Sequence, residues 1–280
     1  MKPSTPLLLV VTATANLAEA KPRIERWRDR ASFEWPLLVV ENGGKTDHWL
    51  NGGPTIIHRT EEWLGSVPAM AKGIALARDL YKPLVIAALH DDVEIEEPGW
   101  DVRVLDHFTQ FKRCGLAGFS GATGLGDDEI YLTPYQPMQL ARRGFRSNLV
   151  DAEAHGERST RVERVVCHDG FSLIGRATWW YWGTKGDGRR GQPPWEVLRA
   201  TGIKHHCYDS LLGVLAAKAS WESWYLPVAC RHLGGRTAVA NREYQQWAMT
   251  QVDGGDAGFW HQAHEIGYEL GRGILPLRMR

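Results

Sequence analysis

The chain has 280 residues, of which 43% are hydrophobic and 24% charged, so it can bury a large core and has an ordinary globular composition. Lysine plus arginine and aspartate plus glutamate balance at 33 each, and no net charge therefore draws the chain to nucleic acid or to a membrane surface. The sequence has no low-complexity tract and no internal repeat, which argues against a repeat protein.

The cysteines and the apolar runs indicate the cellular compartment in which the protein is expected to function. Cys114, Cys167, Cys207 and Cys230 are scattered without a CxxC pair, which argues against a zinc ribbon and against a disulfide-rich secreted module. We expect reduced, mostly buried thiols in a cytoplasmic protein. No apolar run approaches the roughly 20 residues that cross a bilayer. The segment Pro6–Val11 is short for a signal peptide, so we expect a first strand there.

In the first 90 residues, short apolar segments alternate with amphipathic ones. The predicted strands are Pro6–Thr12, Pro36–Glu41, Thr55–His58 and Lys82–Leu89. The predicted helices are Ala18–Arg30 and Val67–Leu80, the second with Ser66 as its N-cap. This alternation predicts an α/β fold with a largely parallel sheet and helices on both faces.

The second half of the chain is less regular. Its predicted elements are a glycine-flanked strand at Gly115–Gly126, an irregular insertion over one sheet edge at Asp127–Arg161, strand signals within Val162–Ile174, a helix at Asp209–Ser220, a short strand at Trp224–Pro227 and amphipathic helical stretches at Asn241–Arg280. We therefore predict one α/β domain over residues 1–240 and a C-terminal helical cap over 241–280.

The fourth predicted strand ends in two adjacent carboxylates, Asp91 and Asp92. In an open α/β sheet, ligands lie beyond the carboxyl ends of the strands. Two acids in that place repel each other unless a cation or a proton joins them. The simplest occupant is a hard divalent ion, which binds carboxylate oxygens and can also hold phosphate oxygens of a substrate. On the acids alone, a solvated acidic turn is an equal alternative.

Glycine-rich phosphate-binding motifs are missing. The first predicted strand is followed by Thr12–Asn16 without GxGxxG, and GxxxxGK[ST] does not occur in the sequence. This disfavours a hydride-transfer enzyme and a P-loop NTPase.

Four segments with candidate ligand or catalytic residues follow one another in a defined order. They are Glu41-Asn42-Gly43-Gly44 after the second strand, His90-Asp91-Asp92 with Pro98-Gly99-Trp100, Cys167-His168-Asp169-Gly170, and Tyr208-Asp209 at a helix start followed by Leu226-Pro227 and His232. Their order and spacing resemble the family 2 type glycosyltransferases with the GT-A fold, over roughly residues 6–235. The resemblance implies a GT-A type, Rossmann-like fold and a hexosyltransferase-like enzyme that uses a nucleotide-diphosphate sugar, for which we expect a UDP-sugar.

The resemblance also implies a metal site. Asp92, the last acid of the triplet, would hold the Mn²⁺ or Mg²⁺ that bridges the donor diphosphate, and Asp91 belongs to the same nucleotide-binding segment. His232 matches a histidine that completes the metal or diphosphate site. His90 stands where the family often has Asp or Asn, and either contacts the nucleotide or supports Asp92.

The other implied roles concern the nucleoside and the sugar. Glu41, which Asn42 follows, matches the position that contacts the nucleoside, and Thr12 with Thr14 falls where the chain passes the base and ribose.

Two further acids match catalytic positions of the family. Asp169 matches a residue that lines the donor and acceptor sugars. Asp209 matches the general base of inverting members, which takes a proton from the acceptor hydroxyl. A plain helix N-cap is the alternative role for Asp209.

Two other function classes stay open at this point. A nucleotidyltransferase would share the parallel core and the acids, but it usually carries a basic, Gly-rich signature near the first strand. A non-catalytic sugar- or nucleotide-binding module is compatible with the 13 tryptophans. No motif identifies the sugar or the acceptor, which is a glycan, a protein, a lipid or a modified nucleic-acid base.

Overall fold

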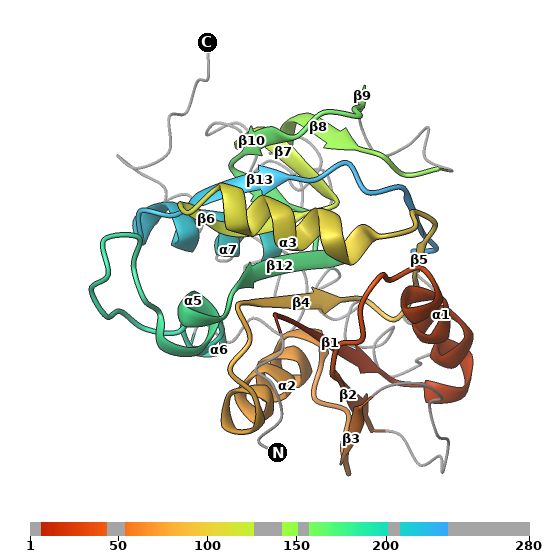
Figure 1. The fold of residues 1–280 in the computed structure, drawn as a ribbon. Coiled ribbons are helices and arrows are strands. Elements are labelled where there is room, and N and C mark those ends of the chain that lie inside the picture. The colour runs from red at the N-terminus through yellow and green to blue at the C-terminus, as the bar shows by residue number, and fades with distance from the viewer. Residues whose placement is uncertain (1–6, 44–53, 126–141, 151–156, 201–207, 235–280) are drawn as a thin grey trace, which may run out of the picture.

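The computed structural model describes residues 7–43, 54–125, 142–150, 157–200 and 208–234. The predicted C-terminal helical cap and the predicted domain boundary at residue 240 lie outside these residues. Within them, a central eight-stranded sheet carries helices on both faces (Figure 1).

The central sheet is mostly parallel, as predicted. Its order is β10-β13-β6-β12-β4-β1-β2-β3. All strands run in one direction except β12, which is antiparallel to its neighbours β4 and β6, and β10 at the edge. The bounds are β1 Leu8–Thr14, β2 Leu37–Asn42, β3 Thr55–Thr60, β4 Val85–Leu89, β6 Cys114–Gly118, β10 Glu163–Val165, β12 Ser172–Arg176 and β13 Glu222–Tyr225.

Each face of the sheet has its own hydrophobic core, because successive strand residues point to opposite faces. Leu8 and Val10 pack with α1 (Leu17–Asp29) and α3 (Trp100–Gln110), whereas Leu9 and Val11 pack with the helices of the other layer. Those helices are α2 Ser66–Leu80, α5 Ala177–Trp182, α6 Pro194–Ala200 and α7 Tyr208–Lys218. Coverage on both faces explains why the parallel strands are continuous apolar runs.

Two predictions about the second half are wrong in part. The segment Gly115–Gly126 forms two strands, β6 in the central sheet and β7 (Ser120–Leu125) in a second sheet, because buried Phe119 separates them. The insertion predicted as irregular contributes β8 and β9 to that second sheet, whose order is β11-β7-β8-β9. The remaining bounds are β8 Arg142–Ser147, β9 Glu157–Arg158 and β11 Cys167–His168.

The helix starts differ in their caps. Asn16 caps α1 by accepting the Glu19 N–H at 3.3 Å. The predicted N-cap role of Ser66 is wrong: Ser66 is the first residue of α2, and Gly65 precedes it with a φ of 92°. A backbone position with positive φ favours glycine. The start of this helix therefore depends on the backbone conformation of Gly65 and not on a capping hydroxyl.

Asp101 anchors α3 to the segment after α1. The fully buried carboxylate accepts the Ser32 N–H at 2.8 Å and the Phe33 N–H at 2.9 Å. In Asp101→Ala both N–H groups lose their acceptor, and we expect the free energy of unfolding to fall by about 3 kcal/mol. Asp106→Ala, on an exposed position of the same helix, should change it by less than about 0.5 kcal/mol in the same urea titrations. Equal effects of the two changes would contradict this anchor role.

His107 makes the fold sensitive to acid. Burial, assisted by nearby Arg176, lowers the pKa of His107 from 6.5 to about 4. The folded state therefore keeps this ring neutral while the unfolded state binds a proton below pH 6.5, so stability falls as the pH drops from 6.5 to 4. The expected loss is about 3 kcal/mol. His107→Phe, whose ring would lie among Phe111 and Trp224, should flatten this pH dependence in chemical denaturation. An unchanged slope would contradict the assignment.

Candidate functional site

The carboxyl ends of adjacent parallel strands bring the predicted nucleotide-binding residues to one edge of the central sheet. Thr14 at the end of β1 lies opposite Glu41 in β2. On the other side of β1, β4 ends one residue before His90. Thr12 and Asn42 are buried in the same strands. Segments far apart in the sequence thus meet at the edge where open α/β sheets bind ligands.

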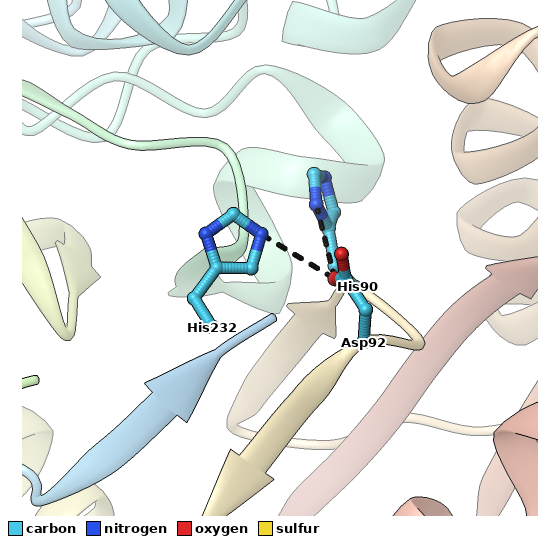
Figure 2. Close-up of side chains that lie close together, drawn as sticks. All are labelled: His90, Asp92 and His232. Carbon is cyan, nitrogen blue, oxygen red and sulfur yellow. Dashed lines mark ion pairs between the residues drawn. The ribbon is translucent and has the colours of Figure 1, made fainter. Parts of the chain in front are cut away.

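Three side chains converge just beyond this edge (Figure 2). His90 and Asp92 lie between β4 and β5 (Val93–Ile95), and His232 is the last residue of β14 (Cys230–His232). One potential ligand atom from each lies within 4.8 Å of the other two. His232 Nε2 is 3.4 Å and His90 Nδ1 is 3.9 Å from the same oxygen, Asp92 Oδ1. This is a cluster that can hold a metal ion.

His232 is held against Asp92 by the backbone and by a ring contact. The antiparallel pairing of β14 with β5 places His232 opposite Val93. The N–H of Leu233 donates to the Asp92 carbonyl at 3.1 Å. The His232 ring stacks on Phe171, with centroids 4.7 Å apart and planes inclined by 25°. The imidazole orientation toward Asp92 is therefore fixed from two sides.

The protonation states within the cluster suit metal binding. Burial raises the pKa of Asp92, but the adjacent His232 and the positive charges available on His90 and His232 outweigh burial, so the net pKa is below the ordinary value. Burial lowers the pKa of His90, against the attraction of Asp92. Asp92 Oδ1 is itself buried, and His232 Nε2 lies 3.4 Å from it. An ionised carboxylate beside a neutral imidazole is the state that metal ligands require.

Hydrogen bonds connect the cluster with the predicted catalytic acids. His90 Nε2 lies 2.7 Å from the Tyr208 hydroxyl, which donates to the Gly170 carbonyl at 3.3 Å. The Gly170 N–H donates to Asp209 Oδ2 at 2.9 Å. The charges of Asp169 and Asp209 both act on the pKa of His90. Both predicted catalytic acids therefore lie around the same imidazole as Asp92.

Asp209 also has a clear part in the fold. The side chain is 4% exposed, and while Oδ2 accepts from Gly170, Oδ1 accepts the Ser210 N–H at 2.8 Å. These bonds tie the start of α7 to the turn before β12. A carboxylate has about four acceptor positions, so two bonds do not saturate it. The predicted base role therefore stays a prediction, which the geometry neither requires nor prevents.

Asp91 is not part of the metal-binding cluster. The Thr14 hydroxyl hydrogen-bonds to its carboxyl group, and Arg23 Nε donates to its backbone carbonyl at 2.6 Å. Burial, followed by the charge of Asp92, raises the pKa of Asp91 from 3.8 to about 6, although Thr14 and Arg23 oppose the rise. The two adjacent acids thus differ in chemistry, since only Asp92 has a depressed pKa and faces the histidines.

The predicted nucleoside-contacting residues have partners within the protein. Fully buried Glu41 accepts from Arg59 Nε at 2.7 Å, and the Arg59 side chain is 45% exposed. The Asn42 amide is occupied at the segment before α2, where it accepts the Leu64 N–H at 2.7 Å and donates to the Gly65 carbonyl at 3.3 Å. At this end of the paired strands β2 and β3, Arg59 of β3 is therefore a partly exposed group that covers buried Glu41.

The sequence assigns no role of their own to two residues of the site, Tyr208 and Arg59. A signal for the first lies in the Asp-Gly pair, because a Cβ at Gly170 would overlap the Tyr208 hydroxyl, so only glycine permits this approach. The signal for the second is the parallel register, which sets Arg59 opposite Glu41. The contacts of Tyr208 and Arg59 in the site can be identified only once the strand register and the position of α7 are known.

A cavity of about 370 Å³ lies elsewhere, among α2, α5 and α6. Its lining includes Trp180, Trp195, Arg78 and Arg199, and none of the predicted site residues. The Trp195 ring approaches the Tyr208 ring to 6.2 Å between centroids. The cavity is thus separate from the metal-binding cluster.

Comparison with known proteins does not identify a family for this chain. No protein-family model matches the chain, and no curated protein matches it either. Among solved structures, the mannosyltransferase PcManGT from Pyrobaculum calidifontis, in complex with GDP-Man and Mn²⁺, is similar with a TM-score of 0.46 and 12% identity. The alignment covers 98% of this chain and 73% of that one. Among the described residues, no helix is long and apolar enough to cross a membrane.

Proposed function

We propose that the protein is a metal-dependent glycosyltransferase. It would move a sugar from a nucleotide-diphosphate sugar, in the first instance a UDP-sugar, to an acceptor hydroxyl with inversion. The observation that supports this most strongly is the position of Asp92 at the carboxyl edge of a mostly parallel sheet. There Asp92 faces two imidazoles and is connected through Tyr208 and Gly170 to Asp209.

The donor atoms of the cluster fit a divalent ion. A buried carboxylate oxygen with a depressed pKa faces nitrogen atoms of two imidazoles, and carboxylate and imidazole together bind divalent metals well. Asp92 and His232 would hold the Mn²⁺ or Mg²⁺. Such an ion supplies the positive charge that stabilises the diphosphate leaving group.

The remaining residues would bind the donor and handle the proton. Thr12 and Thr14 would lie behind the base and ribose, and Glu41 would act on the nucleoside through Arg59, whose side chain is 45% exposed.

In the chemical step, Asp169 would orient the two sugars. Asp209 would accept the proton of the acceptor hydroxyl as its oxygen bonds to the anomeric carbon and the bond from that carbon to the diphosphate breaks. A positioned base of this kind contributes about 10²- to 10⁴-fold to the rate.

A donor screen tests the proposal. The purified full chain is titrated with UDP-, GDP- and dTDP-sugars in the presence of Mn²⁺, and release of the nucleoside diphosphate is followed in parallel. We expect metal-dependent binding and slow donor hydrolysis with at least one UDP-sugar. Neither binding nor hydrolysis with any donor would refute the proposal. Pyrophosphate release from a nucleoside triphosphate would identify a nucleotidyltransferase instead, and donor binding without turnover over many acceptors a binding module.

A further inference from the structure

The cluster has two nitrogen ligands for one oxygen ligand. His90 stands where a carboxylate or amide would give an oxygen-rich site, so the described donor set is two imidazoles and the Asp92 carboxylate. Imidazole suits the first-row transition ions, whereas Mg²⁺ prefers carboxylate, carbonyl and water oxygens. The composition of the cluster therefore bears on which metal the site selects.

The contacts of Tyr208 link its hydroxyl to one particular tautomer of His90. A hydroxyl has one hydrogen, and the Gly170 carbonyl, 3.3 Å away, can only accept it. With the hydrogen on that bond, the hydroxyl oxygen accepts from His90 Nε2, 2.7 Å away. In this arrangement Nε2 bears the N–H, and the lone pair of the neutral ring lies on Nδ1.

A lone pair on Nδ1 lies on the side of the His90 ring that faces Asp92, where a metal ion would bind. Nδ1 is the His90 nitrogen that faces Asp92 Oδ1, at 3.9 Å, and this buried oxygen also has His232 Nε2 3.4 Å away. Two electron-rich atoms so placed repel each other unless a cation joins them. Ligand atoms bonded to one transition ion lie about 3 to 3.4 Å apart, close to the 3.4 Å between His232 Nε2 and the same oxygen.

We propose that His90 is a direct metal ligand through Nδ1, that Tyr208 positions it by fixing this tautomer, and that the site selects a first-row transition ion over Mg²⁺. The inference rests on the proposed function only in assuming that the cluster binds a metal. It decides between the Mn²⁺ and Mg²⁺ left open by the sequence. Outer partners of metal-bound histidines typically change metal affinity by about 10- to 100-fold, which sets the expected effect of Tyr208.

Direct metal binding to the full chain, without any sugar donor, tests the inference. Free Mn²⁺ is followed by electron paramagnetic resonance, Co²⁺ by its visible absorption, and Mg²⁺ by displacement of Mn²⁺. We expect Mn²⁺ and Co²⁺ to bind at least about tenfold more tightly than Mg²⁺. Tyr208→Phe should weaken Co²⁺ binding by about 10- to 100-fold and change the Co²⁺ absorption band.

Tyr181→Phe is the matched control. Tyr181 is a buried tyrosine of α5 whose hydroxyl has no hydrogen-bond partner among the described residues, so its loss should leave Co²⁺ affinity and spectrum unchanged. Should Tyr208→Phe not fold, His90→Gln gives a second test. The variant replaces a nitrogen ligand by an amide oxygen and should lower the ratio of Mn²⁺ to Mg²⁺ affinity.

Equal affinities for Mn²⁺ and Mg²⁺, or a Tyr208→Phe protein with unchanged Co²⁺ affinity and spectrum, would overturn the inference. These readouts are independent of the proposed reaction. Selective metal binding without activity on any nucleotide-sugar would refute only the glycosyltransferase. Sugar transfer that runs equally well with Mg²⁺, in a protein without metal preference, would refute only the role of His90.

Discussion

Asp92→Asn should weaken Mn²⁺ binding by more than about 100-fold and abolish metal-dependent binding of a nucleotide-sugar. The change removes the only carboxylate of the described cluster and the oxygen that both imidazoles face. Loss of an outer partner of a ligand already costs about 10- to 100-fold in affinity, so loss of a ligand should exceed that range. Titration calorimetry with Mn²⁺, alone and with donor, measures both effects.

Asp106→Asn is the charge-matched control for this experiment. Asp106 is exposed on α3, and the same change of charge there should leave metal and donor binding as in the unaltered chain. Thermal unfolding in the presence of EDTA shows whether Asp92→Asn is folded before metal is added. Retention of Mn²⁺ affinity by a folded Asp92→Asn protein would rule out this carboxylate as a metal ligand.

The strands that carry the site could be predicted because their sequences are continuously apolar. Strands β1, β2 and β4 are buried on both faces, and each was expected within three residues of its observed ends. Their parallel arrangement followed from the helices between them. The gathering of Thr14, Glu41 and Asp92 at one edge is thus a consequence of pattern and topology rules alone.

Helix α3 was not predicted, although a pattern for it exists. Trp100, Val104 and Phe108 recur every four residues and are fully buried. The sequence Pro98-Gly99-Trp100, which belongs to the family resemblance, also marks the start of this helix. Gly99, with a φ of 69°, is in fact the residue before the first helical turn.

Other parts of the site depend on pairings that no local pattern reveals. The approach of His232 to Asp92 requires the antiparallel pairing of β14 with β5. The reversed direction of β12 inside the central sheet leaves no mark on its residues, yet it sets the position of the preceding turn with Asp169 and Gly170. For these reasons the contacts that Tyr208 makes with His90 and with the Gly170 carbonyl cannot be predicted from the sequence.

Asp209→Asn should reduce sugar transfer by about 10²- to 10⁴-fold while Mn²⁺ and donor binding stay intact. The rate falls because an amide cannot take the acceptor proton, and binding persists because Asp209 is not in the metal-binding cluster. Transfer is measured at saturating donor, once the donor screen has identified one, and the anomeric configuration of the product is read by nuclear magnetic resonance. We expect inversion.

The two roles of Asp209 can be separated because they predict different losses. As an anchor, the carboxylate accepts one N–H from Gly170 and one from Ser210, and an amide can replace only one of these acceptors. We therefore expect Asp209→Asn to lose about 1–3 kcal/mol of unfolding free energy whether or not it is catalytic. An anchor without catalytic function would leave the rate per folded molecule close to that of the unaltered chain. Only a base makes that rate fall by orders of magnitude in a protein that still binds Mn²⁺ and donor, and this difference is what decides between the two roles.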